Sequence, residues 1–283
     1  MSGYREWRFT SQDGLQLYYR DYGKPLASKT AVLCLAGLTR NSMDFHELAM
    51  RLGGERRVLC PDYRGRGRSD YDPDWRNYEP RTYLNDVSHL LAATGVERAI
   101  VVGTSLGGLL AMGLAALRPL AVAAVVLNDI GPEIEGSGLA RIFDYVGTDR
   151  PMPDMEHAAR FLKHLLPHLA PKADAAWWRR MAEHTYRKRE DGLLHFDWDL
   201  RLARPLMRQR TETNLWALYR GLACIRTLVL RGALSDVLSE RALQRMALEK
   251  PDLTCVTVPD MGHTPTLCET EAVSALDAFL EPL

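Results

Sequence analysis

The stretch VVGTSLGGLLA, Val101–Ala111, holds a serine between glycines at the end of an apolar run. The residues before Gly103 are apolar, which favours a buried strand, and the leucine- and alanine-rich residues after Ser105 favour a helix. Residues 103–107, GTSLG, have the pattern G-x-S-x-G, in which small residues on both sides of the serine allow a tight turn from strand to helix. Such a turn projects the hydroxyl out of the sheet. Ser105 is therefore a candidate nucleophile, and the alternative is a glycine-rich bend with an incidental serine.

A serine hydroxyl is a poor nucleophile until a base removes its proton, so a histidine and an acid are expected elsewhere in the chain. We predict His263, in PDMGHTP, as the base, because it is the only histidine at the C-terminal end of an expected sheet strand. We predict Asp236, in GALSDVLS, as the acid that orients the imidazole, because it follows the strand before that one. Asp129, in VVLNDIGP, is the alternative acid.

The order of secondary structure around these residues indicates a parallel α/β sheet. A hairpin is expected over residues 5–23, with Asp13-Gly14 at its turn. Further strands are expected in 30–37, 56–62, 98–105, 122–131, 227–232 and 254–260, and helices in 44–54, 83–96, 106–119, 239–250 and 269–283. Between residues 132 and 219 the pattern contains no strand, and helical segments with aromatic residues are expected at 157–170, 173–190 and 211–222.

The composition is that of an ordinary globular protein. The chain has 283 residues, of which 46% are hydrophobic and 25% charged, and 36 basic side chains balance 36 acidic ones. A neutral balance gives no electrostatic reason to expect a nucleic acid or an anionic membrane as partner. The N-terminal residues contain no apolar signal region, and no stretch approaches the roughly 18 apolar residues of a membrane span, so we expect a cytoplasmic protein.

The five cysteines do not form a metal or disulfide pattern. Their number is odd and they contain no close pair, which argues against a disulfide framework and a zinc site. Cys34, Cys60 and Cys255 fall in apolar strand-like runs, and we expect buried free thiols there. We expect no cofactor.

The nucleophile turn and the order Ser105, Asp236, His263 resemble the α/β-hydrolase superfamily, in its serine-nucleophile branch with a helical cap. The loop DYRGRGRSD, residues 62–70, resembles the D-x-R-G-x-G-x-S loop of that superfamily. The resemblance implies an eight-stranded, mostly parallel sheet with helices on both faces. It implies a core of residues 1–131 and 220–283, and a cap of residues 132–219.

The resemblance also implies an oxyanion hole made by the backbone N–H of Leu106 and an N–H from the loop after residues 31–37. Many relatives have His-Gly in that loop, whereas this chain has Ala36-Gly37-Leu38. Gly37 still permits the bend and the N–H of Leu38 still serves, because a backbone donor needs no particular side chain. The departure leaves the subfamily open.

The expected function is hydrolysis of a small carboxylic ester or lactone through an acyl-serine, as in enol-lactonase and esterase members of the superfamily. The alternatives are hydrolysis of a carbon–carbon bond in a ring-fission dione acid, acyl transfer or perhydrolysis, and non-catalytic ligand binding. Arg40, two residues beyond Leu38, is a candidate clamp for a substrate carboxylate, and its alternative is a solvated residue or a pair with Asp44. Aromatic residues of the insertion are expected to roof the pocket: Trp177, Trp178, Trp198, Trp216 and Tyr219.

Overall fold

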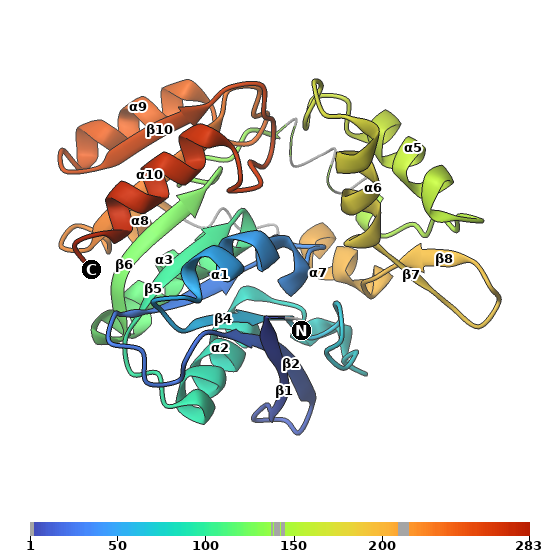
Figure 1. Cartoon of the computed structure of the whole chain (residues 1–283), viewed down its shortest axis with the longest axis horizontal. Coiled ribbons are helices and arrows are strands. Elements are labelled where there is room, and N and C mark those ends of the chain that lie inside the picture. The colour runs from blue at the N-terminus through green and yellow to red at the C-terminus, as the bar shows by residue number, and fades with distance from the viewer. Residues whose placement is uncertain (1–2, 137, 139–141, 143–144, 209–214) are drawn as a thin grey trace.

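The computed structural model describes residues 3–136, 138, 142, 145–208 and 215–283. Figure 1 shows a twisted central sheet with helices around it, and a smaller group of helices and strands at one side. The strands of the central sheet are β1 (Tyr4–Thr10), β2 (Gln16–Tyr22), β3 (Ala31–Leu35), β4 (Val58–Pro61), β5 (Ala99–Thr104), β6 (Val122–Asn128), β9 (Arg226–Gly232) and β10 (Thr254–Val258).

The sheet has eight strands in the order β1-β2-β4-β3-β5-β6-β9-β10. The pairs β1–β2 and β2–β4 are antiparallel, and all other neighbouring pairs are parallel. This confirms the predicted eight-stranded, mostly parallel sheet. Its central strands are short apolar runs because helices cover both faces, and side chains such as Leu33, Val101 and Val126 are fully buried.

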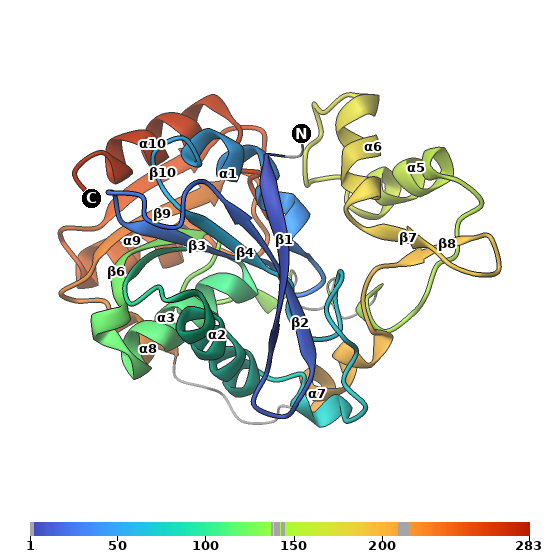
Figure 2. The same ribbon diagram turned by 60° about the horizontal axis from the view of Figure 1, so that its bottom comes forward.

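The helices of the core flank this sheet. They are α1 (His46–Leu52), α2 (Pro80–Thr94), α3 (Leu106–Leu117), α8 (Leu215–Arg220), α9 (Glu240–Glu249) and α10 (Thr270–Leu280). Figure 2 shows α1 and α10 on one side of the sheet, and α2, α3 and α8 on the other. Because β5 and β6 are neighbours at the centre, the residues that follow them meet at one edge of the sheet.

The segment between β6 and α8 contains α5 (Met155–Leu165), α6 (Ala175–Glu183), β7 (Tyr186–Lys188), β8 (Leu194–Phe196) and α7 (Ala203–Arg208). The expectation that this segment contains no strand is wrong. Helix α6 ends at Glu183, and β7 pairs with β8 in an antiparallel hairpin. The reason is the Asp191-Gly192 turn, where Gly192 has φ 83°, a left-handed conformation that favours glycine and closes a hairpin.

Helix α8 lies with the core, although the sequence pattern grouped it with the insertion. It packs against α3, and the hydroxyl of Tyr219 donates a hydrogen bond of 2.9 Å to the carbonyl of Met246 in α9. The cysteines differ from expectation at one strand: Cys34 and Cys60 are buried, whereas Cys255 is exposed because β10 is an edge strand. In the described part of the chain, no helix is long and apolar enough to cross a membrane.

Candidate active site

Ser105 stands at the turn between β5 and α3. Its φ of 52° and ψ of −115° are sparsely populated for a residue with a side chain, and they aim the hydroxyl away from the sheet. The flanking glycines make room for this turn. A Cβ on Gly107 would lie 1.9 Å from the carbonyl oxygen of Leu35, and one on Gly103 would lie 2.3 Å from the carbonyl oxygen of Gly107. Only glycine fits at these two positions without moving the backbone.

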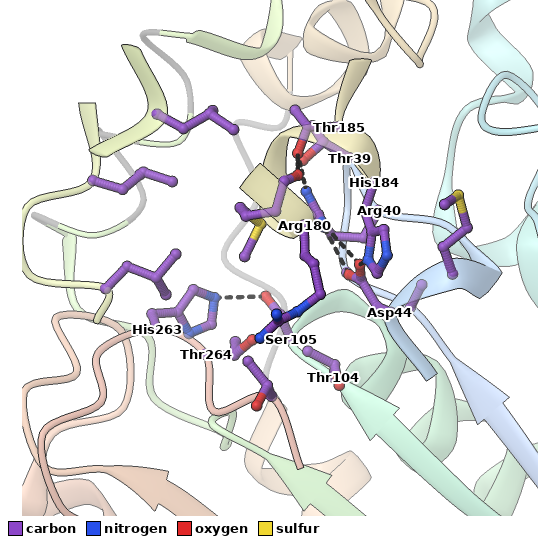
Figure 3. Close-up of a pocket in the computed structure, with 18 of the residues that line it drawn as sticks. Thr39, Arg40, Asp44, Thr104, Ser105, Arg180, His184, Thr185, His263 and Thr264 are labelled. Carbon is purple, nitrogen blue, oxygen red and sulfur yellow. Dashed lines mark hydrogen bonds and ion pairs between the residues drawn. The ribbon is translucent and has the colours of Figure 1, made fainter. Parts of the chain in front are cut away.

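His263 reaches Ser105 from the loop after β10. Its Nε2 lies 2.9 Å from the Oγ of Ser105, and the dashed line in Figure 3 marks this contact. The side chain of His263 is only 7% exposed, so the ring is held between the sheet edge and its neighbours. An imidazole nitrogen at this distance can accept the hydroxyl proton.

The residue bonded to the other nitrogen of His263 is Asp129, which directly follows β6. Its Oδ2 lies 2.7 Å from Nδ1 of His263, and its carboxylate is fully buried. The carboxylate also accepts hydrogen bonds from the backbone N–H of Gly232 (2.8 Å, at Oδ1) and the hydroxyl of Ser235 (2.6 Å, at Oδ2). Three donors therefore fix the carboxylate against the imidazole.

This geometry favours Asp129, the alternative acid, over the preferred Asp236, because Asp129 is the carboxylate that contacts the imidazole of His263. The strands β6 and β9 are parallel neighbours, so the residues after both of them reach the same edge of the sheet. Asp129 is the first residue after β6, and its left-handed φ of 55° turns the side chain toward β9 and His263. Asp236 lies four residues beyond the end of β9, past Ser235, whose hydroxyl serves the Asp129 carboxylate.

Among the described residues, two backbone N–H groups close to Ser105 have no backbone acceptor. Leu106 is the first residue of α3, so its N–H has no acceptor inside the helix. Leu38 lies in the loop after β3, and among the described residues its N–H has no backbone acceptor. In the same loop, Gly37 lies close to Ser105, because a Cβ added to Gly37 would be 3.9 Å from the Cβ of Ser105. The three residues implied by the resemblance therefore lie around the serine.

A buried arginine, Arg66, binds the loop of Leu38, and the sequence analysis did not predict this role. Nε of Arg66 donates a hydrogen bond of 2.6 Å to the carbonyl of Leu38, and the guanidinium lies 4.7 Å from the ring centroid of Tyr83. The hydroxyl of Tyr63 donates to the carbonyl of Ala36 at 3.2 Å. Binding these carbonyls fixes the orientation of the peptide groups on which the N–H of Leu38 depends. Arg66 lies in the loop of residues 62–70 that the sequence analysis identified, but its burial was not predicted because a charged residue in a loop is more often solvated.

Ser105 and His263 open into a cavity of about 350 Å³, within the range of small-molecule sites. Its wall is mainly apolar and includes Trp177 and Trp198, which confirms that aromatic residues of the insertion line the pocket. The other three aromatic residues named above are not among the lining residues. In the described ranges, no three histidine, cysteine or acidic side chains are grouped in the manner of a metal site.

Arg40 also lines this cavity, but its guanidinium is bound within the protein. Nε and Nη2 form a bidentate pair with Asp44 at 2.7 and 2.6 Å, and Nη1 donates to the hydroxyl of Thr185 at 2.6 Å. Burial alone would raise the pKa of Asp44, but the charges of Arg40 and His184 outweigh it and hold that pKa well below its ordinary value. The structure therefore shows the pairing of Arg40 with Asp44, the alternative to a carboxylate clamp (Figure 3).

Comparison with known proteins agrees with this architecture. Residues 32–276 match the model of the alpha/beta hydrolase family. The crystal structure of an alpha/beta hydrolase from Novosphingobium aromaticivorans superposes with a TM-score of 0.95 at 44% identity, covering 100% of both chains. A 3-hydroxybutyrate-oligomer hydrolase of Cupriavidus necator is 32% identical over 93% of this chain and 92% of its own. A 2-(acetamidomethylene)succinate hydrolase of Mesorhizobium japonicum is 30% identical over 82% of this chain and 81% of its own. On these grounds the chain belongs to the alpha/beta hydrolase family.

Proposed function

We propose that the protein hydrolyses a small carboxylic ester, with Ser105 as nucleophile, His263 as general base and Asp129 as the acid that orients it. The observation that carries the proposal is the continuous chain of contacts from Ser105 Oγ to His263 Nε2 (2.9 Å) and from His263 Nδ1 to Asp129 Oδ2 (2.7 Å). A buried carboxylate on Nδ1 keeps the proton there, so that Nε2 is left free to accept the serine proton. A protein that only binds a ligand has no need of this arrangement.

The reaction follows from the positions of these groups. Oγ of Ser105 attacks the ester carbonyl carbon while His263 takes the hydroxyl proton, and the carbonyl oxygen becomes an oxyanion between the N–H groups of Leu38 and Leu106. The C–O bond then breaks, and His263 gives its proton to the departing alkoxide, which leaves as the alcohol. Water attacks the acyl-serine with His263 again as base, and the carboxylic acid is released from a regenerated serine.

The substrate class that we propose is a short ester of a hydroxy acid. The cavity of about 350 Å³ is suited to a compact molecule rather than a long chain. The relative from Cupriavidus necator is named for hydrolysis of 3-hydroxybutyrate oligomers, which are esters of this kind. We also propose that the segment between β6 and α8 forms the cap, because Trp177 and Trp198 from this segment line the cavity.

The proposal is tested with Ser105→Ala, which removes the nucleophile without removing buried bulk. A fluorophosphonate probe is expected to label the wild type and not the variant, and hydrolysis of 3-butanoyloxybutanoate is expected to fall by about 10⁴-fold or more. Ser88→Ala on α2 is the matched control, because its hydroxyl bonds only its own helix. Loss of activity below tenfold in Ser105→Ala, in a preparation free of other esterases, contradicts the mechanism.

A further inference from the structure

A second arginine, Arg180, lies in the same cavity as Ser105. It stands in the last turn of α6 and lines the pocket. Figure 3 shows its side chain extending from α6 toward Ser105. The guanidinium reaches into the space that a substrate would occupy, whereas the charged head of Arg40 is turned to Asp44.

Unlike Arg40, Arg180 is unpaired within the part of the chain that the structure describes. Among the residues that the structure describes, no hydrogen bond or ion pair joins its guanidinium to another group. Of the acids on the cavity wall, Asp44 pairs with Arg40, and Glu183 pairs with Arg179.

The remaining acid on the cavity wall, Glu47, stands on α1, and it is not within ion-pair distance of Arg180 in the described structure. The histidines of the wall, His46, His184 and His263, add no negative charge. Arg180 is therefore a positive group in the cavity of Ser105 that has no counterion among the described residues.

We propose that Arg180 binds the free carboxylate of the substrate, so that this enzyme acts on esters that carry a carboxylate in preference to uncharged esters. This inference rests on the proposed ester hydrolysis. A guanidinium presents two parallel N–H donors that match the two oxygens of a carboxylate, and such a pair fixes orientation as well as adding affinity. An apolar cavity strengthens the pairing because less water competes for either partner.

The position of Arg180 assigns it to recognition and not to bond cleavage. It comes from α6 in the segment between β6 and α8, while Ser105, His263 and Asp129 all follow strands of the core. The carboxylate would therefore be held from above while the ester carbonyl meets Ser105 below.

The test compares two substrates that differ only in charge: 3-butanoyloxybutanoate and 3-butanoyloxybutanamide. In the amide, an uncharged group of nearly the same shape replaces the carboxylate. The ratio of kcat/KM for the carboxylate over the amide is expected to exceed one in the wild type and to fall about 10- to 100-fold in Arg180→Met, the worth of hydrogen bonds to a charged group. Lys163→Met is the matched control, because it removes the same charge from the last turn of α5, where the side chain is exposed and does not line the cavity.

A binding measurement separates this inference from the mechanism. In the Ser105→Ala background no turnover occurs, and calorimetry with 3-butanoyloxybutanoate is expected to show a Kd that rises 10- to 100-fold when Arg180→Met is added. An unchanged Kd, or an equal loss of the carboxylate and the amide, overturns the role of Arg180 whether or not the wild type hydrolyses either compound. If the ratio falls as much in Lys163→Met as in Arg180→Met, the role of Arg180 is overturned too, because the general electrostatic field of the protein and not a contact would then be responsible.

Discussion

Replacing Asp129 by asparagine tests whether the carboxylate of Asp129 orients the imidazole of His263. Asparagine has nearly the same shape and tolerates the left-handed φ of 55° at this position. The carboxylate oxygen Oδ1 accepts the N–H of Gly232 at 2.8 Å, and an amide that turned its NH₂ there would leave that buried donor unpaired. This costs about 1–3 kcal/mol, so the amide oxygen stays at Gly232 and the NH₂ faces Nδ1 of His263.

The NH₂ group facing Nδ1 can only donate, so the imidazole must carry its proton on Nε2. That nitrogen lies 2.9 Å from Ser105 Oγ and can then no longer accept the serine proton. In serine triads the equivalent change of tautomer lowers kcat by about 10⁴-fold, or about 5 kcal/mol in the barrier, with the geometry intact. We expect Asp129→Asn to show a loss of this order.

The assay is steady-state hydrolysis of p-nitrophenyl butanoate, with the melting temperature as a check on folding. Asp236→Asn is the matched control, and its kcat is expected to stay within about threefold of the wild type, because the two ring nitrogens of His263 are bonded to Asp129 and Ser105 instead. If Asp236→Asn loses orders of magnitude while Asp129→Asn remains near the wild type, the assignment is reversed and the contact of 2.7 Å does not orient the base.

Three further outcomes are expected. Arg66→Met should lower kcat about 10- to 100-fold with a smaller change in KM, because it frees the carbonyl of Leu38, whose N–H is a proposed oxyanion donor. An effect on KM alone contradicts this. Gly107→Ala should lower both activity and melting temperature, since its Cβ would lie 1.9 Å from a backbone oxygen, whereas Gly54→Ala meets nothing within 4 Å and should lower neither. Burial raises the pKa of Asp197 to about 7. Between about pH 4 and 7 the folded protein therefore keeps a proton on Asp197 that the unfolded chain has already released. The contribution of Asp197 to the free energy of unfolding falls as the pH rises through that window. The melting temperature of Asp197→Asn relative to the wild type should therefore be higher at pH 8 than at pH 5.5, and a difference independent of pH refutes the shifted pKa.

Much of the fold follows from patterns that are local in the sequence. Buried parallel strands are continuous apolar runs, and the glycines around Ser105 mark the turn that exposes it. The hairpin of β1 and β2 follows from its alternation and the glycine at its turn. His263 could be identified because the apolar run before it marks the end of a strand in the sequence itself.

The features that were not predicted depend on distant contacts. Asp129 and Asp236 both follow sheet strands, and the pairing register of β6 with β9 decides which of them meets His263. Arg180 lies in a helix with the same local pattern as Arg179, and only the packing of α6 over the cavity separates the inward from the outward side chain. The hairpin β7–β8 was missed for another reason. Its Asp-Gly turn is visible in the sequence, but the helical pattern of the residues before it led to the prediction of a helix.

The division of the site between two stretches of chain has a consequence for engineering. The proposed nucleophile, base and acid follow strands of the core, while Trp177, Trp198 and Arg180 come from the stretch between β6 and α8. A chimaera that receives this stretch from another member of the family would keep its bond-breaking groups and change the walls around them. Laboratory evolution of selectivity should accordingly concentrate its libraries on α6 and the β7–β8 hairpin, and leave the strand ends untouched.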